Sequence, residues 1–327
     1  MTTVAAAIRA AMLTADPAAK AMAARKVARD WRLGRLSFVF DAPMPDMPAR
    51  PAAPELLHPG AMPKRGRGGS ERGRLALLHA LAHIEFVAID LALDAAGRFG
   101  GERGPDFVSD WLSVAADEAM HFSLLSRRLK TLGSYYGAMP AHDGLWDAAR
   151  ETAHDVAARI AVVPMVLEAR GLDVTPVTIE RFAQARDDRS ARILQRILDD
   201  EIRHVRFGTK HFAKLCDERR ESPPDLWKML VRQHFRGAIK PPFNDSARRS
   251  AGLSYELMTG GCLTATPAST PQSRDGRGVP TNLENFPPAG CHVRGPAFGG
   301  ERTGGQRRRA SDAKASGQAA KIRLFGS

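Results

Sequence analysis

The sequence contains few cysteines and few aromatic residues. Three of its 327 residues are cysteine, at positions 216, 262 and 291, and aromatic residues make up 6% of the chain. An odd number of cysteines without metal-site spacing argues against both a disulfide framework and a zinc site. We therefore expect a reducing, cytoplasmic location.

Long apolar runs and stretches with strand-like alternation are also missing. No apolar run approaches the roughly 18–20 residues that a membrane-spanning helix needs, so we expect no membrane association. The hydrophobic content of 43% and the charged content of 26% are those of a globular protein. Since no strand pattern competes with the helical ones, the predicted fold class is all-α.

Acidic residues are outnumbered, and the chain carries a net charge of +12. Ten lysines and arginines but five acidic residues follow Ser250, so residues 1–250 carry +7. A basic body is compatible with an anionic or nucleic-acid partner. The basic run Lys64–Arg74 could contact phosphates, but a solvated linker without such a partner is the favoured interpretation.

Composition divides the chain into four predicted segments. Residues 1–40 form an N-terminal helical arm, and residues 41–69 form an extended strap because their prolines and glycines exclude a helix. Residues 70–255 form a helical bundle domain. Residues 256–327 are rich in Gly, Pro, Ser, Thr and Arg, and are predicted to be a disordered tail.

Caps and apolar periodicity place the helices of the arm and of the domain. One expected helix begins near Ser70 and ends near Gly97 to Gly101, and the next starts after Pro105 and stops at Gly133. The others are expected near Val4–Met12, Ala18–Trp31, Leu145–Gly171, Val174–Ala185, Asp188–Cys216 and Asp225–Ala238. Ser70 and Asp106 are the predicted N-caps of the two helices that they begin. Pro164 lies four residues before Glu168 and is expected to bend its helix there.

Glutamates lie at four positions where a helix is expected to be most apolar: Glu85, Glu118, Glu168 and Glu201. Trp111 and Phe122, seven residues before Glu118 and four after it, share its helical face. A buried carboxylate is costly unless it is paired, protonated or bound to a metal. These four residues therefore need partners.

A repeated spacing suggests what those partners are. Glu118 and Glu201 each begin a Glu-x-x-His motif, and each follows another glutamate by 33 residues. Helical-bundle proteins that hold two iron or manganese ions use this arrangement, in which carboxylates suit hard dications and imidazole suits iron. The predicted ligands of two iron ions, or of manganese, are Glu85, Glu118, His121, Glu168, Glu201 and His204.

Neighbouring polar residues predict a layer of support around the ligands. Asp117 and Asp200 precede the two motif glutamates, and each is predicted to accept a hydrogen bond from a ligand histidine. In one arrangement, each aspartate accepts from the histidine of the other motif. An ordinary surface acid is the alternative. Arg203 could balance negative charge or be solvated, and His79 and His83 are expected at the core edge or beside the ligands.

A third Glu-x-x-His copy, Glu151 and His154, is predicted to be unrelated to the centre. Glu151 lies 17 residues before Glu168 on the predicted helix, which is roughly 25 Å away and about 100° off its face. A solvated pair is the favoured interpretation of this copy.

Six stretches match motifs of a known family in their order along the chain. They are HALAHIEFVAIDLALD (79–94), DWLSVAADEAMHF (110–122), AHDGLW (141–146), PMVLEARGLDVTP (164–176), LDDEIRHV (198–205) and PFNDSARRSAG (242–252). On these motifs the chain resembles the DUF455 family of bacterial ferritin-like proteins, over about residues 5–255. The resemblance implies a ferritin-like four-helix core with a dinuclear metal site at the six ligands, and it implies no substrate. At the level of Asp-Glu-x-Arg-His, the chain is also similar to di-iron hydroxylases, including the tRNA-hydroxylating kind.

The ligand pattern and the resemblance together favour an oxygen-activating di-iron oxidase or monooxygenase. It would act on an unidentified small molecule with O₂ and an electron donor, and Glu168, beside the predicted bend, is the candidate catalytic carboxylate. The alternatives are iron handling of the ferroxidase kind, an RNA-modifying hydroxylase and a purely structural bundle. We expect a monomer or a dimer rather than a storage shell.

Overall fold

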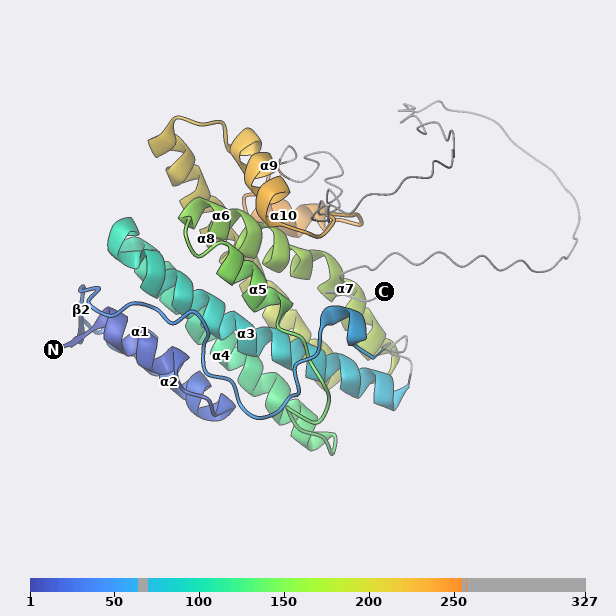
Figure 1. The fold of residues 1–327 in the computed structure, drawn as a ribbon. Coiled ribbons are helices and arrows are strands. Elements are labelled where there is room, and N and C mark those ends of the chain that lie inside the picture. Colours follow the sequence, from blue (N-terminus) through green and yellow to red (C-terminus); the bar gives the residue numbers. More distant parts are fainter. Residues whose placement is uncertain (64–69, 255–256, 258–327) are drawn as a thin grey trace, which may run out of the picture. The chain divides into compact units, whose positions relative to one another are not determined.

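The computed structural model describes residues 1–63, 70–254 and 257 (Figure 1). In this part of the chain the regular structure is almost entirely helical, which confirms the all-α prediction. Two short strands, β1 (Thr2–Thr3) and β2 (Leu36–Ser37), pair in parallel. The predicted tail, apart from Leu257, and residues 64–69 of the basic run lie outside the described residues.

Ten α-helices and two short helical stretches of other kinds are described. The α-helices are α1 (Val4–Met12), α2 (Pro17–Arg32), α3 (Glu71–Arg103), α4 (Pro105–Thr131), α5 (Gly144–Glu151), α6 (Val156–Val162), α7 (Ala169–Gln184), α8 (Asp188–Arg219), α9 (Pro223–His234) and α10 (Asp245–Ser250). The other two are a 3₁₀ turn, η1 (Pro59–Ala61), and a π-helical stretch, η2 (Val163–Glu168).

Local chemistry explains where the helices begin. The hydroxyl of Ser70 accepts a hydrogen bond from the amide of Gly73 at 3.1 Å, so Ser70 caps α3 as predicted. The predicted cap Asp106 is wrong, because α4 begins one residue earlier with Gly104 as its N-cap. Pro105 fits the first helical position because it has no N–H group to leave unpaired.

The predicted helix Leu145–Gly171 is the main error in the element boundaries. α5 ends at Glu151, and a new helix starts after Asp155, whose side chain accepts a hydrogen bond from the amide of Ala157 at 2.9 Å. From α6 the chain then continues through η2 into α7 without interruption. Gly171 is therefore inside α7 rather than at a helix end, and the predicted helix Val174–Ala185 is the remainder of α7.

Pro164 lies within η2. A proline cannot donate the i→i−4 hydrogen bond of an α-helix, and the wider π-helical turn is one way to accommodate the missing bond. The chain thus keeps a continuous helix through Pro164, and η2 ends at Glu168.

The bundle consists of α3, α4, α8 and the continuous α6–η2–α7 helix. α3 packs along α4, α7 packs along α8, and α4 packs against α8 (Figure 1). Large apolar side chains such as Phe86, Trp111 and Phe212 are buried between the helices. This packing brings together the four helical segments that carry the predicted ligands.

The N-terminal arm is part of the same core. α1 packs on α3, and α2 packs on α4 (Figure 1). The fully buried ammonium group of Lys20 contacts Asp90 of α3 at 2.7 Å and the carbonyl of Ala49 in the strap at 2.9 Å. One buried cation therefore connects the arm, the strap and α3.

α3 is a longer apolar helix than the sequence prediction allowed. By length and composition it could cross a membrane, since an 18-residue window has a mean hydropathy of 1.7. However, 67% of that window is buried inside the protein. Its apolar character is therefore accounted for by its place in the helical core.

Candidate metal centre

The six predicted ligands are distributed over the four bundle segments, and each segment carries at least one. Glu85 lies on α3, Glu118 and His121 on α4, and Glu201 and His204 on α8, whereas Glu168 is the last residue of η2. A three-residue spacing is close to one helical turn, so the glutamate and histidine of each motif share a face. Of the six residues, those on the α-helices are at most 9% exposed, while Glu168 is half-buried.

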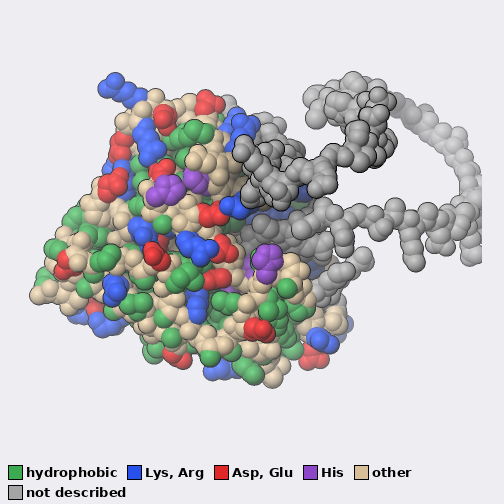
Figure 2. All heavy atoms as spheres, viewed as in Figure 1, with side chains coloured by type: hydrophobic (Ala, Val, Ile, Leu, Met, Phe, Trp, Pro, Cys, Tyr) green, Lys and Arg blue, Asp and Glu red, His purple; other side chains and the backbone are tan. Residues whose placement is uncertain are grey.

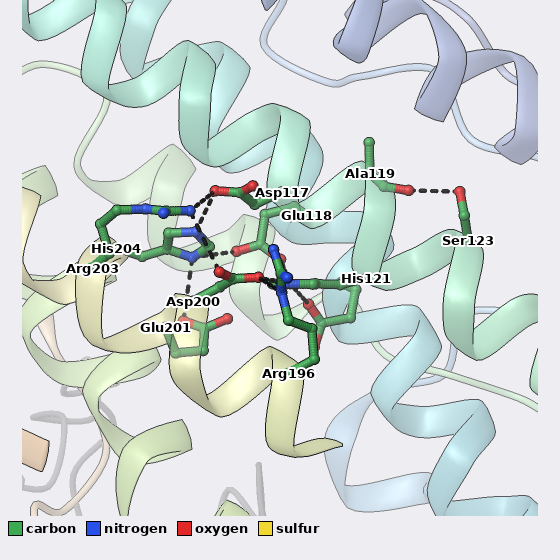
Figure 3. Close-up of polar contacts among 11 residues, drawn as sticks. Asp117, Glu118, Ala119, His121, Ser123, Arg196, Asp200, Glu201, Arg203 and His204 are labelled. Atoms are coloured by element: carbon green, nitrogen blue, oxygen red, sulfur yellow. Dashed lines mark hydrogen bonds and ion pairs between the residues drawn. The ribbon is translucent and has the colours of Figure 1, made fainter. Parts of the chain in front are cut away.

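The ligand atoms converge on Glu118. The Nδ1 atom of His121 is 3.2 Å from Glu85 Oε2 and 3.4 Å from Glu118 Oε2. The Nδ1 atom of His204 is 3.1 Å from Glu118 Oε1 and 3.6 Å from Glu201 Oε2. Glu118 thus stands between the two histidines, with one oxygen facing each (Figure 3).

Within this set, the tightest group is Glu85, Glu118, His121 and Glu201. One ligand atom from each lies within 4.8 Å of the others, and all four residues are buried. These residues could hold a metal ion, because carboxylate oxygen and imidazole nitrogen are the ligands that iron, manganese and zinc accept. His204 and Glu168 lie outside this tightest group.

Several polar atoms of the cluster are buried without a hydrogen-bond partner. They are Glu118 Oε1, Glu168 Oε2, Glu201 Oε2 and His204 Nδ1. Where two of them are close, as between His204 and Glu118, the directions of the atoms do not suit a hydrogen bond. Buried polar atoms are nearly always satisfied. Unpaired atoms that belong to neighbouring carboxylates and an imidazole fit a set of ligands waiting for cations.

The second nitrogen of each ligand histidine contacts an aspartate of the other motif. His121 Nε2 is 3.1 Å from Asp200 Oδ2, and His204 Nε2 is 3.2 Å from Asp117 Oδ2 (Figure 3). If each Nε2 carries the proton and donates it to the aspartate, Nδ1 keeps its lone pair toward the glutamates. That tautomer is the one a metal-ligating histidine needs.

Arginines connect these aspartates to the surface. Arg203 contacts Asp117 at 2.5 Å and Asp200 at 3.5 Å, which places this predicted charge-balancing residue beside both acids. Arg196 contacts Asp200 at 2.7 Å (Figure 3). Sequence reasoning missed Arg196, although its position four residues before Asp200 on one helix was a readable signal.

The electrostatics of the cluster depend on burial and on crowded carboxylates. Burial raises the pKa values of Glu85 and Glu168, and a neighbouring glutamate carboxylate raises each further. Burial also acts on Glu118, but the adjacent imidazoles of His121 and His204 outweigh it and lower the pKa of Glu118. Without a metal, the cluster therefore retains protons that divalent cations would replace.

Other candidate residues contact different partners. Both ring nitrogens of His83 are engaged with the loop after α4, at 2.9 Å from the Tyr136 hydroxyl and 3.2 Å from the His142 carbonyl. His79 accepts a hydrogen bond from the amide of Gly137 at 2.9 Å. These histidines fasten that loop to α3, and a role for His83 beside the ligands stays a prediction.

The third Glu-x-x-His copy is dispersed by the break between α5 and α6. Glu151 ends α5 and pairs with Arg236 at 3.1 Å, while His154 lies in the following turn and packs against the ring of His234. The side chain of Glu151 is 38% exposed. Since its two residues are not on one helical turn, this copy has no shared face.

A cavity adjoins the cluster, and its space of about 710 Å³ includes the solvent at its open side. Glu85, Glu118, Glu168 and Glu201 all line it. The remaining lining comes mainly from aliphatic side chains of α3, η2 and α8. This cavity could not be predicted from the sequence, because aliphatic residues in the same pattern also form an ordinary core.

A known protein family matches most of the chain that forms this fold. The family model described as "Protein of unknown function (DUF455)" matches residues 13–259. A relative from Haemophilus influenzae (strain ATCC 51907 / DSM 11121 / KW20 / Rd), which carries the name "Uncharacterized protein", is 46% identical over 223 residues; these cover 66% of this chain and 77% of the relative. No solved structure shows a significant match. Because the family model covers well over half of the sequence, the chain belongs to the DUF455 family.

Proposed function

We propose that the protein is a dinuclear-metal oxidoreductase of the ferritin-like type, with two iron ions held by the six predicted ligands. The observation that carries the proposal is the group of buried, unpaired ligand atoms on neighbouring glutamates and a histidine. Two pairs of carboxylates would balance the charge of two dications. Ferrous ions bound there would supply electrons to O₂.

The chain's own residues would divide the work. Asp117 and Asp200 orient His204 and His121 through Nε2, so that both Nδ1 atoms face the glutamates. Glu118 lies between the two histidines and is suited to bridge two ions. Glu168 is the half-buried glutamate, follows a π-helical stretch and lines the cavity, so it is the candidate carboxylate that shifts during turnover.

The cavity separates the first two candidate functions. Iron handling without an organic substrate needs a route for ions, whereas a largely aliphatic cavity beside the ligands suits an organic molecule. The cavity therefore favours an oxidase or monooxygenase over a ferroxidase. For the RNA-modifying alternative, basic and acidic side chains are interspersed on the face drawn in Figure 2, and no extended basic patch stands out there.

Oxygen consumption tests the proposed chemistry. The purified chain would receive Fe(II) without oxygen and then be exposed to air-saturated buffer in a sealed oxygen electrode. We expect uptake that exceeds the oxidation of free Fe(II), and loss of the excess in Glu118→Ala. Glu151→Ala, which alters the dispersed third motif, is the matched control and should retain it. Equal uptake by wild type and Glu118→Ala would contradict the proposal.

A further inference from the structure

We propose that the cavity beside the candidate metal centre binds an uncharged, predominantly apolar organic molecule. That the bound molecule is the substrate rests on the proposed function. That such a molecule binds rests on the cavity alone. The observation that carries the inference is the chemistry of the cavity lining beside the four glutamates.

The lining of the cavity defines the class of molecule. Apart from the four glutamates, Thr175 is its only polar side chain among the described residues. The others are aliphatic residues and Gly171, and none of the described lining residues is Lys, Arg or His. A ligand carboxylate or phosphate would therefore meet protein carboxylates without a basic partner, which makes its burial unfavourable.

Several of the lining residues on α3, α5 and α7 are partly exposed. Leu81, Leu145, Gly171 and Thr175 line the cavity and are half-buried, whereas Val163 lines it and is fully covered. The rim is therefore formed by residues from separate helices, and the covered residues lie deeper. An apolar molecule that binds beside Gly171 removes aliphatic surface from water, which favours binding.

Gly171 offers a direct way to close the cavity. A Cβ atom built on Gly171 meets no other atom within 4 Å, and Gly171 has no left-handed backbone that a side chain would strain. It lies inside α7, where a leucine is a better helix former than glycine. Gly171→Leu should therefore fold and place its side chain in the open space. Val177→Leu, at an exposed position of the same helix, is the matched control.

The experiment uses the full chain after removal of metal with a chelator, so that bound cations cannot attract anions. Binding of Nile red, a neutral apolar dye, is followed by its fluorescence, and 1-decanol and decanoate then compete with it above neutral pH. We expect 1-decanol to displace the dye at a concentration at least about tenfold lower than decanoate requires. Gly171→Leu should weaken dye binding by about tenfold or more, and Val177→Leu should not change it.

Displacement by decanoate as effective as that by 1-decanol would overturn the assigned class of ligand. Wild-type dye binding by Gly171→Leu, with helical content verified by circular dichroism, would overturn the assignment of the cavity. The metal content of Gly171→Leu, expected to equal that of wild type, separates the two proposals. For the wild-type chain, absent dye binding with normal metal content would reject this inference alone, and absent metal with normal dye binding would reject the proposed function alone.

Discussion

Each of the two predicted ligand histidines uses its two ring nitrogens differently. Nε2 contacts an aspartate, at 3.1 Å for His121 and 3.2 Å for His204, while Nδ1 faces glutamates. The aspartate comes from the other motif in both cases, so α4 and α8 hold one another's histidines in place. Removal of one aspartate should therefore affect the histidine on the opposite helix, and not the histidine of its own motif.

Asp117→Asn and Asp200→Asn test this crossed support. Each change keeps the shape of the side chain and removes the charge that accepts the histidine proton. We expect each to lower the affinity for Fe(II) or Mn(II) by about 10–100-fold, the usual effect of losing such a partner. Asp199→Asn, next to Asp200 on the exposed face of α8, is the control. Isothermal titration calorimetry measures the affinity for the metal ion. An unchanged affinity in both variants would show that the aspartates do not support the histidines as ligands.

Reasoning from single residues succeeded where chemistry and helical spacing coincide. Glu118 and His121 were found because an acid on an apolar stripe is costly, and they do lie in a buried cluster with Glu85 and Glu201. Arg196 was missed, and so was the fastening role of His79, because each depends on a partner placed by the fold. Sequence spacing alone does not define contacts between different elements.

Close packing between η2 and α8 depends on a glycine. A Cβ atom on Gly208 would lie 2.7 Å from both Cβ and Cγ of Pro164, which is closer than carbon atoms approach without rearrangement. Gly208 and Pro164 thus let the π-helical stretch approach α8 near the predicted ligands Glu168 and Glu201.

Gly208→Ala is predicted to destabilise the protein, although alanine favours helix. Overpacking against Pro164 should cost about 1–3 kcal/mol, more than the roughly 1 kcal/mol that alanine gains over glycine inside a helix. Gly171→Ala, where a Cβ meets open space, is the matched control and should be neutral or stabilising. Urea unfolding measures both, and a Gly208→Ala variant as stable as the control would refute this account of the contact.

Helices were easier to predict than their interruptions. α1 has its predicted bounds, and α8 begins at the predicted Asp188. The break between α5 and α6 escaped prediction because no Pro or Gly marks it and apolar residues continue across it. The cap Asp155 was the available signal, but an aspartate also occurs inside helices and does not by itself end one.

Over the whole molecule, buried ion pairs hold distant segments on the bundle. Asp90 of α3 pairs with Lys20 of α2 and with Arg50 of the strap, and Arg159 of α6 contacts Asp94 of α3 at 2.5 Å. Lys20 and Asp90 are 70 residues apart, and nothing in either local sequence identifies the partner. The fold class and four ligand-bearing helical segments could be predicted, but the wrapping of the arm around them could not.

The central claim is that the cluster on the four bundle segments holds two metal ions. It is tested most directly by measuring metal per chain by plasma mass spectrometry after expression in iron-supplemented medium. We predict about two irons per chain, the number that dinuclear helical bundles hold, for wild type and Glu151→Ala, and loss of metal in Glu118→Ala and His204→Ala. Metal-free wild-type protein, or variants at Glu118 and His204 that retain the wild-type metal content, would contradict the account.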